Sequence, residues 1–211
     1  MVRYLASTIG RKRRRDAAAL CVALALLMAA SGRALYGEPR DDSALRTLVQ
    51  YLGTGQTVVE LDGVLMTSGD PVFDDDFDNG VLDSPPWFIV SGAPGPESES
   101  VLAMHDGDAI IAAVSPVAGT TTVEAAAHLV DFDDGSSMSL VLLGASQDDL
   151  LLLTVLSGTA LLNSEQGELA SLPVVLGEQV LLRLTYTDAG EVTALVNDQI
   201  VFDGAETFGP I

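Results

Sequence analysis

Residues 179–202 read QVLLRLTYTDAGEVTALVNDQIVF, and this stretch decides the fold. Apolar residues occupy every second position in two parts of it, at Val180, Leu182, Leu184 and Tyr186 and again at Val192, Ala194 and Val196. A period of two is the pleat of a strand with one buried face. The two breaks, Asp188-Ala189-Gly190 and Asn197-Asp198, contain residue types that accept the positive φ of hairpin turns. The stretch therefore predicts three strands in an antiparallel meander.

Short runs of the same kind recur at even intervals from residue 72 onward. They cover residues 72–77, 87–90, 100–104, 109–114, 121–130, 137–143, 150–156, 159–162, 179–187, 191–196 and 199–202. Residues 150–153 are all leucine, and the short length of the run and the flanking Asp149 and Gly158 favour a strand covered on both faces over a fragment of helix. Many short strands without helices between them predict an all-β fold, a two-layer antiparallel β-sandwich or jelly roll around one core.

The first 36 residues have the pattern of a secretory signal peptide. Basic residues at positions 11–15 precede an apolar run over residues 17–30, which contains Cys21, the one cysteine of the chain. As a helix at about 1.5 Å per residue the run spans roughly 21 Å, less than the roughly 30 Å of a membrane core. We expect cleavage and export, to the medium, the cell surface or the envelope, with no membrane contact beyond this segment. The alternative is an uncleaved signal anchor.

Residues 37–71 are less regular, and we interpret them as an N-terminal extension to a sandwich over residues 72–211. Leucine and valine recur there at a spacing of three and four, at Leu45, Leu48, Val49 and Leu52. This spacing predicts one short helix. A strand over residues 57–66 follows it.

The charge of the chain excludes a nucleic-acid binder that neutralises phosphates, because the formal net charge is -20. Without residues 1–36, the cations are Arg40, Arg46 and Arg183 against 29 of the 30 acids, so the net charge becomes 3 − 29 = −26. Three explanations stay open: bound divalent cations, a saline habitat that screens the repulsion, or simple solubility.

Two segments carry a resemblance to a known family. Residues 73–87 read FDDDFDNGVLDSPPW, and residues 181–204 read LLRLTYTDAGEVTALVNDQIVFDG. The pair resembles the concanavalin A-like lectin and glucanase superfamily, in particular bacterial LamG (laminin G)-like domains, with Asp198 where glycine is usual. The resemblance implies two antiparallel sheets with a concave binding side. It also implies a secreted or cell-surface module that recognises a glycan or an extracellular protein.

The resemblance further implies a structural calcium ion where the first and last strands meet. Asp76, Asp78 and Asn79 of the opening segment and Asp203 of the last strand are the candidate ligands, because Ca²⁺ prefers carboxylate and amide oxygens. The alternative is a solvated acidic edge that blocks strand-to-strand aggregation. Trp87 is a weak candidate for stacking on a sugar, against the alternative of an anchor in the core.

Catalysis finds little support, and we expect no catalytic residue. The Glu-x-Asp-x-x-Glu pattern of laminarinase-type glucanases is absent from the sequence. Glu124 and His128 share a strand face, where a polar surface is the simpler interpretation, and we expect Arg183 to pair with a neighbouring carboxylate. A glycoside-hydrolase-like enzyme on the same sandwich and a purely structural envelope protein stay as alternatives to a binding module.

Overall fold

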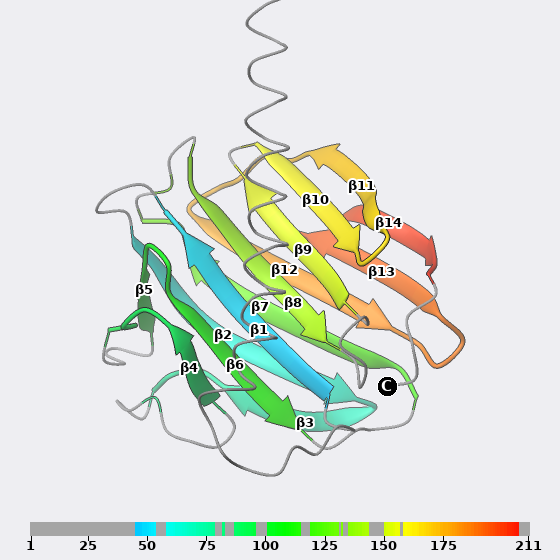
Figure 1. Ribbon diagram of the computed structural model, residues 1–211, viewed down its shortest axis with the longest axis horizontal. Coiled ribbons are helices and arrows are strands. Elements are labelled where there is room, and N and C mark those ends of the chain that lie inside the picture. Colours follow the sequence, from blue (N-terminus) through cyan, green and yellow to red (C-terminus); the bar gives the residue numbers. More distant parts are fainter. Residues whose placement is uncertain are drawn as a thin grey trace, which may run out of the picture. The chain divides into compact units, whose positions relative to one another are not determined.

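The computed structural model describes residues 45–53, 58–78, 82, 87–95, 101–114, 119–130, 132, 135–143, 150–156 and 158–206. Within these residues the protein is all-β, with strands and no helix (Figure 1). The strands are β1 (Leu45–Leu52), β2 (Val58–Ser68), β3 (Asp70–Asp75), β4 (Trp87–Ser91), β5 (Leu102–His105), β6 (Ala109–Val114), β7 (Thr121–His128), β8 (Ser137–Leu143), β9 (Leu150–Leu156), β10 (Thr159–Ser164), β11 (Gly167–Pro173), β12 (Gln179–Tyr186), β13 (Glu191–Val196) and β14 (Gln199–Ala205).

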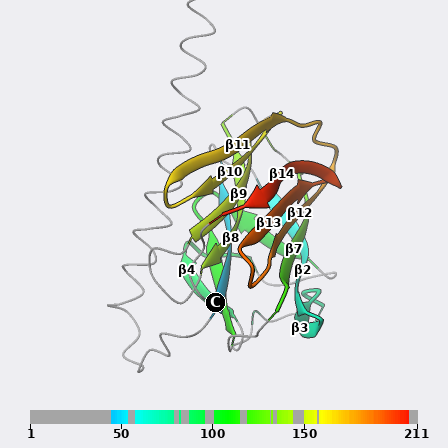
Figure 2. The same cartoon turned by 90° about the vertical axis from the view of Figure 1, so that its right-hand side faces the viewer.

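The strands form two antiparallel sheets of seven strands each. Sheet A has the order β11-β10-β9-β8-β1-β6-β4, and sheet B has the order β14-β13-β12-β7-β2-β3. The short strand β5 also pairs with β2, beyond the stretch of β2 that pairs with β3. The two sheets lie face to face as two layers (Figure 2), so the predicted antiparallel β-sandwich is confirmed at this level.

The core lies between the sheets and is lined by the alternating positions that the sequence indicates. The inward side chains of β12 and β13 are all buried, and so are Val123, Ala125 and Ala127 of β7. Leu129, which the sequence places on the same face, follows β7 and is half-buried against the core. In β7, β12 and β13 of sheet B, alternation thus determines which face excludes water.

The hairpin turns of the meander also follow the sequence. Gly190 has a φ of 82°, and its N–H donates to the carbonyl of Thr187, which closes the β12–β13 turn. Asn197 and Asp198 both have positive φ, at 49° and 61°, in the two-residue β13–β14 turn. These residue types adopt the left-handed region at little cost, so the turn fixes the register of the last two strands.

The predicted short helix at residues 45–52 is wrong, because this segment is the strand β1. It pairs with β8 on one side and with β6 on the other, so it is an inner strand of sheet A. Val49 and Tyr51 reach the core, and the alternate residues Leu48 and Gln50 lie on the opposite face. Hydrogen bonding to two neighbours overrides the weak helical spacing. Together with β2, it extends the sandwich to residues before residue 72.

The two sheets differ in how far their outer faces are buried. The strands β8, β9 and β10 are buried at every position, which confirms that residues 150–153 form a strand covered on both faces. The strands β7, β12 and β13 of sheet B instead alternate between buried and half-buried or exposed positions. Sheet B therefore presents a solvent-accessible outer face.

Several predictions lie outside the described residues. The signal peptide over residues 1–36 and the candidate ligand Asn79 are among them. In the part of the chain that the structure describes, no helix has the length and apolar character needed to cross a membrane.

Candidate functional site

The outer face of sheet B is the side of β2, β7, β12 and β13 that points away from the core. The strand register arranges its side chains in cross-strand rows, which are Glu60–His128–Gln179, Gly63–Ala126–Leu181, Leu65–Glu124–Arg183–Leu195 and Thr67–Thr122–Thr185–Thr193. Two rows that carry ionisable groups thus flank a row of small and apolar residues. Directly opposite side chains on one sheet face interact, so each row is a chemical unit.

An ion pair lies at the centre of this face. The Nε atom of Arg183 donates to Oε1 of Glu124 at 2.7 Å, and Nη1 of Arg183 lies 3.6 Å from Oδ1 of Asp198. The structure thus places a carboxylate beside Arg183, as the sequence predicts. Arg183 is the one lysine or arginine whose side chain the structure describes, and its guanidinium group interacts with both of these carboxylates.

A second polar cluster surrounds His128 at the end of β7. Nε2 of His128 lies 3.0 Å from Nε2 of Gln179 and 3.5 Å from Oδ2 of Asp62. The amide nitrogen of Gln179 can only donate, so Nε2 of His128 is the acceptor of this hydrogen bond. Asp62 then faces an acceptor atom at a distance too long for a hydrogen bond. Asp62 and His128 thus form a contact of ion-pair length rather than a hydrogen bond.

A β-bulge explains why Asp62 reaches this face. The β2–β7 register shifts between Leu61 and Gly63, so Asp62 is an extra residue on β2. Burial raises the pKa of Asp62, the charge of nearby His128 lowers it, and the charge of Glu60 raises it again. Bulges re-aim side chains and are frequent next to functional sites.

Threonines line the other end of the face. The hydroxyls of Thr122 and Thr185 lie 3.0 Å apart, and Thr193 donates to Oδ1 of Asp203 at 3.3 Å. These residues present short hydroxyl groups on neighbouring strands, at a spacing of about 4.8 Å. The outer face of sheet B therefore offers donors and acceptors on both sides of the row of small and apolar residues.

Trp87 is not at the surface. Its side chain is 2% exposed, and its Nε1 donates to Oδ2 of Asp75 at 2.6 Å. The same carboxylate accepts the backbone N–H of Phe77 through Oδ1, and the rings of Phe73 and Phe77 pack against Trp87. Stacking on a sugar requires an exposed ring, so the structure supports the alternative that Trp87 anchors the core. Sequence reasoning did not single out Asp75 for this role.

The candidate calcium ligand Asp203 is not brought together with Asp76 and Asp78. Asp76 and Asp78 follow β3, while Asp203 lies in β14, and these two strands are the opposite edges of sheet B. Five strand spacings of about 4.8 Å separate them by roughly 24 Å, so Asp203 cannot share an ion with the other two. Repulsion from Asp76 raises the pKa of Asp78. No cluster of three or more metal-binding side chains occurs among the described residues.

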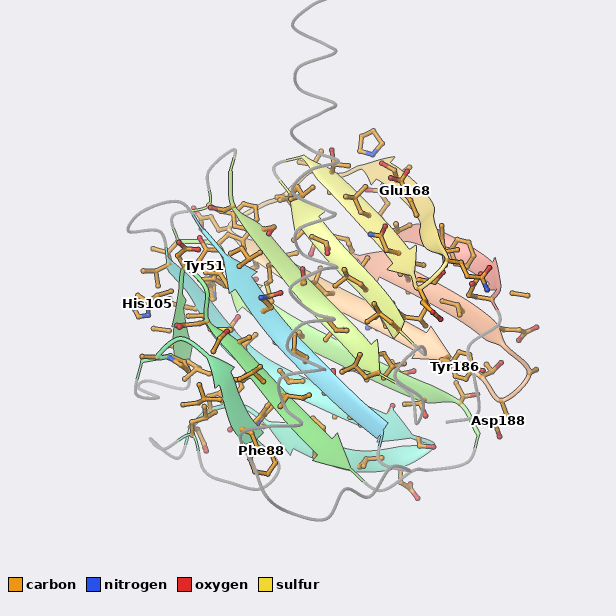
Figure 3. All side chains as sticks on the ribbon, in the orientation of Figure 1. Tyr51, Phe88, His105, Glu168, Tyr186 and Asp188 are labelled. Carbon is orange, nitrogen blue, oxygen red and sulfur yellow. The ribbon has the colours of Figure 1, made fainter. Side chains whose placement is uncertain are left out.

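Asp108 is a buried carboxylate that the sequence did not reveal. The sequence predicts a solvated turn around His105. The His105 ring does point outward (Figure 3), but Asp108 in the same turn is 2% exposed. Its Oδ1 accepts the N–H of Ala93 and its Oδ2 accepts the N–H of His105, both at 2.7 Å. Gly92 has a φ of 77°, and a Cβ there would lie 1.8 Å from Oδ1 of Asp108. The carboxylate thus ties the β4–β5 loop to the β5–β6 turn.

Comparisons with protein-family models, with curated proteins and with solved structures give no match for this chain. The kinship with LamG-like domains therefore stays a prediction. The interpretation of the outer face of sheet B depends on the chemistry of its own residues.

Proposed function

We propose that this chain is a secreted or cell-surface binding module, a concanavalin A-like jelly roll of the LamG type, and that its ligand is a glycan or an extracellular protein. The outer face of sheet B is the proposed recognition surface. The observation that carries the proposal is the set of cross-strand polar contacts on this face, Glu124 with Arg183 and His128 with Gln179. A sheet face built from preformed hydrogen-bonding pairs loses little side-chain entropy on binding.

The signal-peptide pattern of residues 1–36 and the strongly acidic composition support the proposed location outside the cytoplasm. Cell fractionation, followed by N-terminal sequencing of the recovered protein, tests this part. Export predicts a shortened chain in the medium or the envelope fraction. A full-length chain in the cytoplasm contradicts it.

Binding is tested with the exported protein on arrays of glycans and of extracellular proteins from its own source. The expected result is a ligand whose binding is reduced by Arg183→Ala and unchanged by Glu168→Ala, a carboxylate on the edge strand β11 of the other sheet. Thermal melts of both variants show whether the fold is intact. A ligand bound equally by both variants contradicts the assignment to sheet B, and no ligand in either array contradicts a binding module.

We also propose a calcium ion at the acidic loop after β3, limited to Asp76, Asp78 and Asn79. The supporting observation is the proximity of two carboxylates: the backbone N–H of Asp78 donates to Oδ1 of Asp76, and the charge of Asp76 raises the pKa of Asp78. A divalent cation relieves such repulsion between like charges.

A further inference from the structure

The outer face of sheet A is the side of β1, β8, β9 and β10 that points away from the core. One cross-strand row of this face consists of Leu48, Val141 and Leu152, which lie opposite one another in the register. The outward positions of the four strands carry large apolar side chains, at Leu48, Val141, Leu143, Leu150, Leu152, Leu156 and Leu161. Among the described side chains of this face, none is ionisable. The outer face of sheet A is therefore apolar and neutral where the structure describes it.

These seven apolar side chains are buried, although they point away from the core. Each is at most 8% exposed, yet none belongs to the core cluster between the sheets. Sheet B packs against the other side of sheet A (Figure 2), and every described strand belongs to one of the two sheets. The cover of this face therefore comes from outside the described strands.

The exported protein proposed above has little chain left for such a cover. The residues that the structure does not describe form one long stretch, residues 1–44, and several short ones. Removal of residues 1–36 leaves stretches of at most eight residues, about the length of one strand, whereas the face is four strands wide. An apolar patch of this extent on a soluble protein marks an interaction surface.

Gln50 gives an independent sign of a missing partner on this face. It lies between the core residues Val49 and Tyr51, so its amide points to the outer face. The residue is 1% exposed, but neither its Nε2 nor its Oε1 has a hydrogen-bond partner, and Nδ2 of Asn163 on the same face also lacks one. Buried polar groups are nearly always hydrogen-bonded. An amide carries donors and an acceptor on one side chain, so two copies of Gln50 related by a twofold axis can pair with each other.

The apolar area of this face reaches the range of stable dimers. Burying one leucine or valine side chain removes about 60–120 Å² of apolar surface from water. Seven such side chains from each of two copies bury about 800–1,700 Å² in total, and specific protein interfaces bury about 1,200–2,000 Å². Contact between two such faces brings no described carboxylates together, although the chain as a whole has a net charge of -20.

We propose that the exported protein is a dimer, in which two copies of this chain pack against each other through the outer faces of sheet A, about a twofold axis near Gln50. This inference goes beyond recognition by sheet B and rests on the proposed removal of residues 1–36. The outer faces of sheet B then point away from the interface on both sides. Each dimer presents the recognition surface twice, which favours ligands with repeated units.

The test is sedimentation equilibrium of the exported protein at about 0.15 M salt, with N-terminal sequencing of the same sample. Leu152→Glu places a charge in the interface, and Gln50→Glu does the same with almost no change in size. The matched controls are Leu181→Glu and Gln179→Glu, the same substitutions on β12 of sheet B. Thermal melts followed by Trp87 fluorescence show whether each variant is folded. The nearly isosteric Gln50→Glu keeps the test decisive if Leu152→Glu does not fold.

The expected result is a dimer for the wild type and for both controls. Leu152→Glu and Gln50→Glu should each raise the dissociation constant of the dimer at least about tenfold, because an unpaired charge in an apolar interface loses its hydration. A dimer that neither variant weakens more than its control does overturns the assigned face. A shortened protein that stays monomeric overturns the dimer, and its recovery with phosphatidylcholine vesicles assigns the face to a lipid surface instead.

The same measurements separate this inference from the other proposals. A full-length monomer overturns the proposed cleavage and the dimer together, and it means that the chain covers the face by itself. A shortened dimer that binds nothing on the glycan and protein arrays supports the dimer and overturns the binding module alone.

Discussion

Replacing Asp108 tests whether one buried carboxylate holds the loops at the β4–β5 edge of the sandwich. In the Asp108→Ala variant the N–H groups of Ala93 and His105 both lose an acceptor that lies 2.7 Å away. A hydrogen bond to a charged group contributes about 1.5–3 kcal/mol, and because both bonds are only part-buried we take the low end for each, which gives about 3 kcal/mol for the pair. In Asp108→Asn one oxygen remains for one N–H, so one of the two bonds is lost and the expected cost is about 1.5 kcal/mol.

Urea unfolding at pH 7 measures these costs. Trp87 is the one tryptophan and is 2% exposed, so its fluorescence reports the loss of the core. The midpoint should fall in the order wild type, Asp108→Asn, Asp108→Ala, with an unchanged slope. The matched control is Asp106→Asn, an exposed neighbour that accepts one N–H from Gly53. Surface substitutions usually change the free energy of unfolding by no more than about 0.5 kcal/mol. If the free energies of unfolding of the Asp108 variants lie within about 0.5 kcal/mol of that of Asp106→Asn, the reasoning is refuted.

Three further predictions follow from the same loops and from sheet B. Gly92→Ala should destabilise the protein far more than Gly107→Ala. Both glycines have positive φ, but a Cβ at Gly92 would meet the Asp108 carboxylate, whereas a Cβ at Gly107 would meet nothing within 4 Å. Similar unfolding midpoints for the two variants would contradict this. Burial raises the pKa of Asp62 above its ordinary 3.8. The folded protein therefore binds a proton on Asp62 more tightly than the unfolded chain does, and the free energy of unfolding falls as the pH rises through the window above 3.8. Asp62→Asn should therefore raise the melting temperature relative to wild type more at pH 7 than at pH 3, and a pH-independent difference would count against the argument. Millimolar Ca²⁺ should raise the melting temperature of the wild type but not of Asp76→Ala, and no shift in either protein would remove the calcium proposal.

Most of the architecture is predictable from the sequence. A strand with one face in the core and one face in solvent carries an apolar residue at every second position. The strands β12, β13 and β14 show this best, since their inward residues and both turns are as the sequence indicates. The contact between Arg183 and Glu124 is also predictable, because both residues lie on the outward positions of their strands. Local pattern and global fold agree in these elements.

The elements that the sequence does not predict are those whose secondary structure depends on pairing with strands far away in the sequence. The strand β1 lies between two neighbours in sheet A and is buried on both faces, with the polar Thr47 and Gln50 among its buried residues, so it lacks alternation and its spacing imitates a helix. The strand β11 is an edge strand whose positions are all exposed or half-buried, so its sequence has no alternating apolar pattern. The β2 bulge reads as Asp62-Gly63, a dipeptide typical of a turn, and only the pairing with β7 shows that it lies inside a strand.

The candidate site illustrates the same limit at the level of chemistry. A composition with 30 acids and 10 cations predicts a repulsive surface but does not say where the repulsion is concentrated. The register answers that question, because Glu60 and Asp62 reach the face of sheet B that carries His128, while the inner strands of sheet A carry no carboxylate. Negative charge on the sandwich strands is therefore directional. Burial accounts for this asymmetry, because the strands β8, β9 and β10 of sheet A are buried at every position and an unpaired carboxylate there would lose its hydration.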